Sequence, residues 1–135
     1  MIATVLFACV HNAGRSQMAA ALFNQLADRA RATAISAGTE PIERVHPEVV
    51  AVMREEGVDL AAAKPRLLTD EVGSGVAVLV TLGCGESCPV VPGARRLDWP
   101  LGDPKGQPIE RVRALREEIR RRVVQLLDEN GWRRG

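Results

Sequence analysis

Aromatic side chains are scarce in this 135-residue chain, which has two Trp, two Phe and no Tyr. Proteins that hold single-stranded nucleic acid stack its bases on aromatic side chains, so that class of protein is not expected. The formal net charge is only +1, and so small a charge gives no overall field that would attract nucleic acid or a membrane surface. The sequence therefore predicts neither nucleic acid nor a membrane as a partner.

Long hydrophobic runs are also missing. The first apolar stretch covers residues 2–10, whereas a membrane-spanning helix needs about 20 residues. No basic segment precedes that stretch, as one would in a signal peptide. We therefore expect a cytoplasmic protein. The length, with 46% hydrophobic residues, suits one domain over residues 1–135 that buries its own core.

Cysteine is limited to three residues, Cys9, Cys84 and Cys88. In a reducing compartment a cysteine is more often catalytic, redox-active or metal-binding than part of a structural disulfide. Cys84 and Cys88 share a glycine-containing loop, and two such thiols form a disulfide if the loop bends. Half of a zinc site is the alternative, but His11 and His46 show no ligand spacing. We favour the redox interpretation and expect no metal.

Strand-like and helix-like segments alternate along the chain. A continuous apolar run predicts a strand that is buried on both faces, and apolar residues at spacings of three and four predict an amphipathic helix. Strands are expected at residues 2–8, 33–36, 75–83 and 94–99, and helices at residues 16–31, 46–57 and 66–72 and from Pro108 to Leu126. Such alternation forms a parallel sheet with crossover helices on both faces. The predicted fold class is therefore α/β.

The sequence CVHNAGRS, residues 9–16, lies between the first predicted strand and the first predicted helix. Ligands of parallel sheets bind at the carboxyl ends of strands, and helix N-termini favour anions. The backbone N–H groups of such a loop can surround a tetrahedral oxyanion, while Gly14 allows close approach and Arg15 binds two oxygens. The positive charge of Arg15 and the helix N-terminus also favour the thiolate form of Cys9, to which Ser16 can donate a hydrogen bond. The predicted oxyanion-binding residues are Cys9, Val10, His11, Asn12, Ala13, Gly14 and Arg15.

A buried structural cysteine that happens to precede an arginine is the other interpretation of Cys9. The spacing Cys-x5-Arg-Ser at a strand-to-helix junction is much more specific than a lone cysteine, so we favour a nucleophile. Asn12 is expected to hold the shape of the loop, because asparagine tolerates left-handed backbone.

These segments resemble the low-molecular-weight protein tyrosine phosphatase superfamily, and most closely its cysteine-triad arsenate reductases. The resemblance covers nearly the whole chain and rests on VLFACVHNAGRSQMAAALF, ISAGT, HPEVVAVMREEGVDL, VTLGCGESCP and LDWPLGDPKGQ. It implies a three-layer sandwich of flavodoxin-like topology, with a four-stranded parallel sheet and the anion loop at its edge. Some members bind potassium through a glutamate of the first helix, where this chain has Ala20. No cofactor is expected.

The resemblance also implies roles for the three cysteines in reducing arsenate to arsenite for arsenic detoxification, with phosphate or sulfate as competing anions. Cys9 attacks arsenate, and Cys84 then attacks Cys9 and releases arsenite. Cys88 attacks Cys84 and moves the disulfide outward to thioredoxin. The better-known arsenate reductases space the last two cysteines more widely than Cys-x3-Cys, so a low-molecular-weight thiol is the alternative reductant.

Asp103, followed by Pro104, has two interpretations. Asp-Pro is a common turn dipeptide. In the resembled superfamily, however, an Asp-Pro loop carries the general acid that protonates the leaving oxygen, which makes Asp103 the candidate acid. Asp98 is the nearby competitor.

Two other functions stay open. A phosphatase that hydrolyses phosphate monoesters through a phosphocysteine would use the same loop, because phosphate and arsenate are tetrahedral anions of like charge. Phosphotyrosine enzymes of this superfamily place aromatic residues after the Asp-Pro, whereas Lys105 and Gly106 follow here, and Trp99 and Phe23 are the plausible platforms nearby. A phosphatase also has no need for two further cysteines. The second alternative is a non-enzymatic arsenite or metal binder that uses the three thiols.

Overall fold

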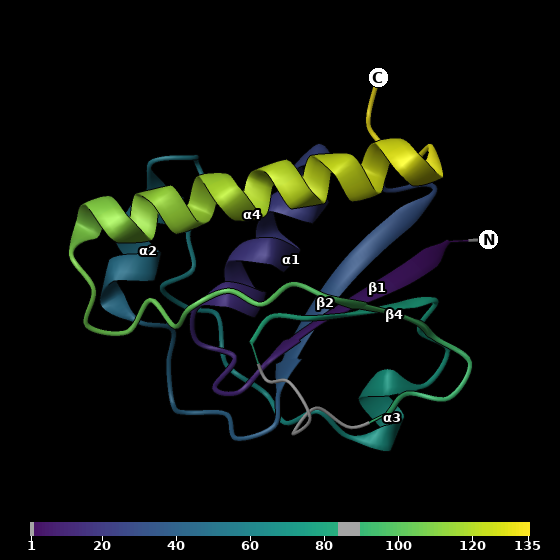
Figure 1. The fold of residues 1–135 in the computed structure, drawn as a ribbon, viewed down its shortest axis with the longest axis horizontal. Coiled ribbons are helices and arrows are strands. Elements are labelled where there is room, and N and C mark those ends of the chain that lie inside the picture. Colours follow the sequence, from purple (N-terminus) through teal and green to yellow (C-terminus); the bar gives the residue numbers. More distant parts are fainter. Residues whose placement is uncertain (1, 84–89) are drawn as a thin grey trace.

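A four-stranded parallel sheet forms the centre of the computed structural model, which describes residues 2–83 and 90–135 (Figure 1). The strand order is β2-β1-β3-β4, with β1 at Ala3–Cys9, β2 at Ala32–Gly38, β3 at Val78–Thr81 and β4 at Arg95–Asp98. The helices are α1 (Arg15–Leu26), α2 (Pro47–Arg54), α3 (Asp70–Gly73) and α4 (Ile109–Asn130). The predicted α/β class, with four parallel strands, is confirmed.

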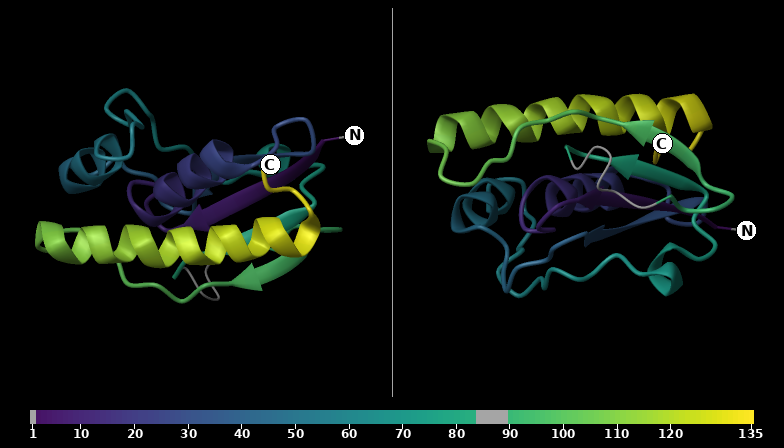
Figure 2. Two further views of the ribbon diagram at one scale, coloured as in Figure 1. Left: turned by 90° about the horizontal axis from the view of Figure 1, so that it is seen from above. Right: turned by 60° about the horizontal axis from the view of Figure 1, so that its bottom comes forward.

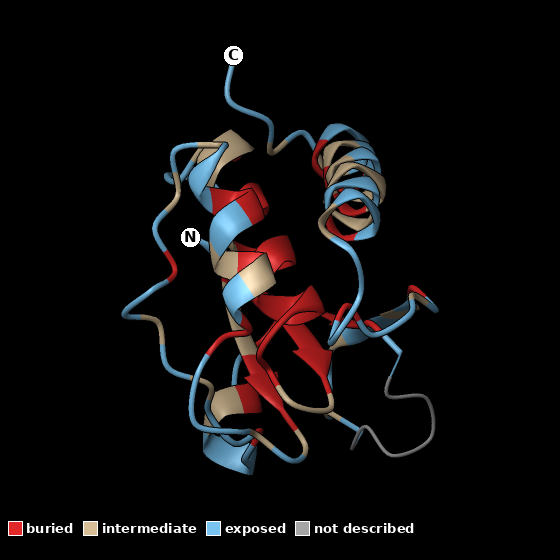
Figure 3. Cartoon of the chain, turned by 90° about the vertical axis from the view of Figure 1, so that its left-hand side faces the viewer, coloured by how far each residue is buried: buried red, intermediate tan, exposed pale blue. Residues whose placement is uncertain are grey.

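The two faces of the sheet are covered unequally. Helices α1, α2 and α4 lie over one face, where their apolar residues form the main core with Val5 and Phe7. The other face packs against a thinner layer that includes Leu68, Val76 and Val91, from the segment around α3 and the chain before β4 (Figures 1 and 2). Both layers are needed because β1 is apolar at nearly every position, so each of its faces must be buried. Figure 3 shows this as buried strands with buried helix faces turned toward them.

The first and third predicted helices have other bounds in the structure than expected. The first ends at Leu26, because Ala27 is already extended and bridges Arg133. The helix predicted over residues 66–72 is wrong in its first half, where Leu67 instead pairs with Gly38 beside β2. A single turn begins after Thr69, whose hydroxyl accepts a hydrogen bond from the backbone N–H of Val72. That cap stabilises the N-terminus of α3.

The long helix α4 begins directly after Pro108 and runs past the predicted end, Leu126, to Asn130. The next residue, Gly131, has a φ of 69°, the left-handed conformation that commonly terminates helices. Its buried positions are Val112, Ile119, Val123, Leu126 and Leu127. In the part of the chain that the structure describes, no helix is long and apolar enough to cross a membrane.

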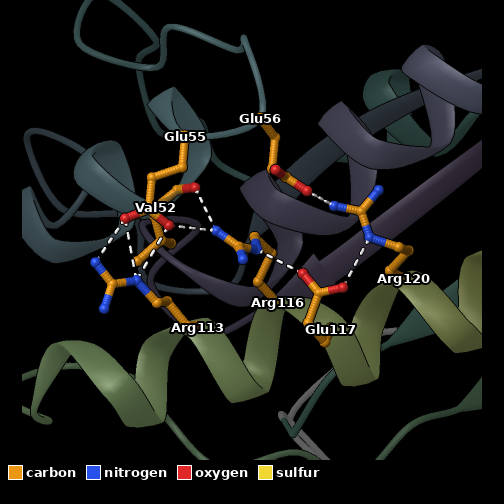
Figure 4. A network of polar contacts seen from close by, with 7 residues as sticks. All are labelled: Val52, Glu55, Glu56, Arg113, Arg116, Glu117 and Arg120. Atoms are coloured by element: carbon orange, nitrogen blue, oxygen red, sulfur yellow. Dashed lines mark hydrogen bonds and ion pairs between the residues drawn. The ribbon is translucent and has the colours of Figure 1, made fainter.

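A polar network joins α4 to α2 and the residues after it (Figure 4). Its members are Val52, Glu55, Glu56, Arg113, Arg116, Glu117 and Arg120. Glu55 accepts hydrogen bonds from Arg113 and from Arg116 at 2.7 Å each. Arg116, whose side chain is 11% exposed, also donates to the backbone carbonyl of Val52 at 2.8 Å. The network fixes α2, the helix that follows the segment packed on the anion loop.

This network is expected to lose part of its stabilising effect at acid pH. Hydrogen bonds from Arg113, and then from Arg116, lower the pKa of Glu55 from 4.5 to about 2. Because the folded-state pKa is depressed, the stabilisation is complete above pH 4.5 and is lost as pH falls toward 2. We expect Glu55→Gln to lower the thermal midpoint at neutral pH and to weaken its decline between these two pH values. Thermal unfolding followed against pH tests this, and Glu43→Gln, an exposed carboxylate elsewhere, is the matched control. The same decline of the thermal midpoint between pH 4.5 and 2 in both variants would contradict this prediction.

Candidate active site

The loop between β1 and α1 lies at the carboxyl edge of the sheet. Strand β1 pairs with β2 on one side and with β3 on the other, so the chain leaves β1 at the point where the strand order reverses. Open parallel sheets bind ligands at such a point. Cys9 is the last residue of β1 and is 2% exposed. The predicted nucleophile therefore ends a rigid central strand, directly before the anion loop.

Five consecutive backbone carbonyls, from residue 9 to residue 13, accept hydrogen bonds from outside the loop. The donors to these carbonyls are the backbone N–H groups of Thr39, Glu40, Ile42 and His46 and the side-chain amide of Gln17. Among the described residues, the backbone N–H groups of residues 11–15 have no protein acceptor. The loop carbonyls accept hydrogen bonds from residues outside the loop, and the loop N–H groups remain available for a ligand. This arrangement fits the backbone anion-binding nest expected from the sequence.

Close approach of β2 requires a glycine beside the loop. A Cβ at Gly38 would lie 2.5 Å from the Val10 carbonyl oxygen and 2.9 Å from the Asn12 nitrogen. Both atoms are backbone, so they could not yield without moving the loop. Gly38, the last residue of β2, is therefore part of the packing that shapes the anion loop.

A chain of hydrogen bonds leads from Asn12 to the sulfur of Cys9. Asn12 has a φ of 51°, the left-handed conformation that asparagine tolerates. Its Nδ2 donates to Ser16 Oγ at 2.7 Å, and Ser16 Oγ lies 2.8 Å from Cys9 Sγ. Because the hydroxyl already accepts from the amide, its own proton is free to be donated to sulfur. The backbone N–H of Arg66 donates to Asn12 Oδ1 at 3.0 Å and so fixes the orientation of the amide.

The guanidinium of Arg15 lies at the start of α1 and is almost completely buried, at 6% exposure. One end nitrogen donates to the Leu101 carbonyl at 2.9 Å. Its Nε is buried and has no hydrogen-bond partner among the described residues. A buried donor without an acceptor is costly, and an oxyanion in the loop would supply the acceptor. Gly83 makes room for this side chain, since a Cβ there would lie 2.1 Å from the Arg15 end nitrogen.

The segment that carries the candidate acid packs directly on the loop. A carboxylate oxygen of Asp103, Oδ2, lies 3.9 Å from Arg15 Nη2 and 3.8 Å from His11 Nδ1. The other oxygen, Oδ1, accepts from the backbone N–H of Lys105 at 2.9 Å. Pro104 touches Gly14, where a Cβ would come within 2.7 Å of the proline ring. Asp103 therefore shapes a turn and also lies beside the anion loop. The turn interpretation and the general-acid interpretation are thus compatible.

Asp98, the competing acid, is engaged at the end of β4. It accepts a hydrogen bond from Thr81 and one of 3.1 Å from Arg96. These two bonds, that of Thr81 first, lower the pKa of Asp98. A carboxyl group held ionised in this way is a poor proton donor, so the geometry favours Asp103.

The aromatic side chains suggested as substrate platforms are not available for that role. Phe23 is fully buried and Trp99 is 8% exposed. The Phe7 ring contacts both, with centroids 5.9 Å from Phe23 and 5.8 Å from Trp99. Trp132, the remaining aromatic residue, packs on Phe23 near the C-terminal end of the chain. The suggestion is therefore corrected: sequence spacing could not show that these rings face the core.

The structure does not describe two of the predicted site residues, and it shows two contacts that were not predicted. Cys84 and Cys88 lie outside the described residues, so their predicted pairing stays a prediction. The contacts of Arg15 with the Leu101 carbonyl and of Asp103 with the His11 imidazole were not predicted from the sequence. A backbone carbonyl carries no sequence signal, and His11 was expected to contribute only through its backbone.

Comparison with known proteins agrees with this geometry. Residues 4–131 match the family model described as low molecular weight phosphotyrosine protein phosphatase. A putative arsenate reductase of Halobacterium salinarum is 42% identical over 128 residues, which cover 91% of this chain and 89% of that protein.

Two solved structures are similar as well. The arsenate reductase of Archaeoglobus fulgidus has a TM-score of 0.79 and 38% identity, over 92% of this chain and 98% of that one. The thioredoxin-dependent arsenate reductase Cg_ArsC1' of Corynebacterium glutamicum has a TM-score of 0.80 and 39% identity. That match covers 95% of this chain but 61% of the Corynebacterium chain, which is therefore considerably longer than the part it shares with this protein.

Proposed function

The chain belongs to the low molecular weight phosphotyrosine protein phosphatase family, and we propose that it is an arsenate reductase that converts arsenate to arsenite. The observation that carries the proposal is the combination of an oxyanion loop around Cys9 with core burial of Phe7, Phe23 and Trp99. A loop without an aromatic platform suits a free tetrahedral anion better than an aryl phosphate ester. The relatives named as arsenate reductases support the same choice.

The proposed reaction begins with Cys9. Its thiolate, which Ser16 stabilises through the 2.8 Å contact, attacks arsenic and displaces one oxygen as water. The guanidinium of Arg15 and the loop N–H groups bind the remaining oxygens, because a planar fork and a backbone nest both match an oxyanion. Asp103 protonates the leaving oxygen as general acid.

A second thiol then completes the reduction. We propose that Cys84 attacks the sulfur of Cys9, so that a Cys9–Cys84 disulfide forms while the arsenic–sulfur electron pair stays on arsenic, which leaves as arsenite. Cys88 then attacks Cys84, and thioredoxin reduces the outward disulfide. The alternative reductant is a low-molecular-weight thiol that attacks the Cys9 adduct directly. Reactions of this kind need reduced thiols, which supports a cytoplasmic location.

The central experiment measures arsenite formed from arsenate with two reductants in separate reactions. One contains thioredoxin, its reductase and NADPH, and the other contains a low-molecular-weight thiol. Arsenate-dependent NADPH consumption through thioredoxin supports the proposal. Efficient turnover of an aryl phosphate without arsenite formation would favour the phosphatase, and tight arsenite binding without turnover would favour the binder.

The same assay with Cys88→Ser tests the relay. The variant is expected to release one equivalent of arsenite or less and then to stop with thioredoxin as reductant. Mass spectrometry of the halted protein should show Cys9 cross-linked to Cys84. Free turnover of Cys88→Ser with thioredoxin would mean that the Cys9–Cys84 disulfide is reduced directly. Activity of both Cys84→Ser and Cys88→Ser with a small thiol would make the two loop cysteines accessory.

Asp103→Asn is expected to lower kcat by roughly 10²–10⁴-fold, the usual contribution of a general acid, while anion binding changes little. The amide keeps the size of the side chain and can still accept from Lys105 but has no proton of suitable acidity. Turnover is measured beside inhibition by phosphate. If phosphate inhibition is lost while kcat is kept, Asp103 is only a turn residue and the acid lies elsewhere.

A further inference from the structure

Arsenate reduction needs two protons, and this requirement sets it apart from the transfer of a phosphoryl group. Counted from neutral thiols, the first step is Cys–SH + HAsO₄²⁻ + H⁺ → Cys–S–AsO₃H⁻ + H₂O. The second is Cys–S–AsO₃H⁻ + R–SH + H⁺ → Cys–S–S–R + As(OH)₃, where R–SH is a second thiol and arsenic gains the two electrons that the thiols lose. Asp103 can supply the first proton, but it is then a carboxylate and must be reprotonated before arsenite leaves.

The imidazole of His11 lies where such a proton could come from. Its Nδ1 is 3.8 Å from Oδ2 of Asp103, and its side chain is 34% exposed. Because the Lys105 N–H holds Oδ1, Oδ2 is the oxygen that faces both His11 and the Arg15 guanidinium. Catalytic hydrogen bonds that are long in the free enzyme commonly shorten when substrate binds. Histidine is also the side chain whose charge changes between about pH 5 and 8.

We propose that His11 is a positioning residue that returns a proton to Asp103 between the two steps of arsenate reduction. The imidazolium passes its Nδ1 proton to Asp103 Oδ2, and Asp103 then gives it to the departing arsenite. The partly exposed imidazole regains a proton from solvent. No electrons move in this transfer. The inference rests on the proposed function, because only a reaction that takes up a second proton requires it.

Charged or titratable groups in and beside the loop bear on the pH dependence of a reaction that uses His11. Asp103 lies 3.8 Å from the imidazole, and Arg15 and Lys105 contact Asp103 in turn. Cys9 precedes the loop in sequence, and the backbone N–H groups of Glu40 and His46 bind loop carbonyls. Among the described residues, Asp103 is the carboxylate with a contact within 4 Å of the imidazole, so it is the group through which a His11 proton would act.

The test compares His11→Gln and His11→Ala with the wild-type protein in the arsenate assay between about pH 6 and 9. Glutamine keeps a polar side chain of similar length but neither takes up nor releases a proton between about pH 6 and 9. We expect kcat of both variants to fall about tenfold to hundredfold at pH 8 and less at pH 6, where hydronium reprotonates Asp103 directly. KM for arsenate and inhibition by phosphate should stay within about twofold of wild type.

Chemical rescue separates a proton donor from a structural residue. Imidazole added to His11→Ala should restore several-fold of the lost kcat, and substituted imidazoles should do so in the order of their acidities. His46→Ala, the matched control at the other histidine, should not respond to imidazole. If His11→Gln and His11→Ala keep the wild-type kcat across this pH range, or lose kcat without rescue, or lose phosphate inhibition instead, the inference is wrong. If the wild-type protein forms no arsenite, the proposed function fails first.

Discussion

Cys9→Ser is expected to abolish arsenate reduction and any side activity on aryl phosphates, with a loss of roughly 10⁴-fold or more. A serine hydroxyl is far less acidic than a thiol and is a weak nucleophile without an adjacent base. The group that Cys9 Sγ contacts, Ser16 Oγ at 2.8 Å, is itself a hydroxyl and is not a base that could activate a serine at position 9. The variant also cannot form a disulfide, so the second half of the reaction is lost as well.

Phosphate binding is the control that keeps this result interpretable. The nest of backbone N–H groups and the Arg15 guanidinium are intact in Cys9→Ser, so calorimetric binding of phosphate should stay close to wild type. Thermal unfolding should change little, because oxygen replaces sulfur at a site that already contacts Ser16. Substantial arsenite formation by a verified Cys9→Ser protein would show that another thiol is the nucleophile.

The fold was predictable where one local pattern decides the outcome. Strand β1 is apolar at nearly every position, which indicates burial on both faces. Apolar residues at spacings of three and four predict one long helix from Pro108 to Leu126, and the structure has α4 at Ile109–Asn130. The segment at Leu67 was mispredicted as helix because its pairing partner, Gly38, lies far away in sequence. Backbone pairing of that kind depends on tertiary contacts that a local pattern does not contain.

The active site divides in the same way. Cys9, Arg15 and Ser16 lie within eight consecutive residues, so their spacing is enough to predict the site. The burial of Trp99 and the bond from Arg15 to the Leu101 carbonyl depend on how β4 and the segment after it return to the sheet. For that reason the sequence suggested Trp99 as a platform, whereas the structure shows it in the core.

That tertiary bond makes Arg15→Lys a severe change rather than a conservative one. The arginine side chain has two tasks, since one end nitrogen is committed to the Leu101 carbonyl at 2.9 Å while Nε and the other end nitrogen remain for the oxyanion. A lysine ammonium is a single point charge and cannot do both in one plane.

We therefore expect Arg15→Lys to lower kcat/KM for arsenate by roughly 10²–10³-fold, or about 2.7–4 kcal/mol of transition-state stabilisation. Arg15→Ala should be only slightly worse, because what matters is the planar fork and not the charge alone. Steady-state arsenite formation by the two variants measures this, with phosphate inhibition as the readout of anion binding. Arg111→Lys, at an exposed position of α4, is the matched control. Near-normal kinetics with lysine at position 15 would mean that the guanidinium holds the Leu101 segment and does not bind the reacting anion.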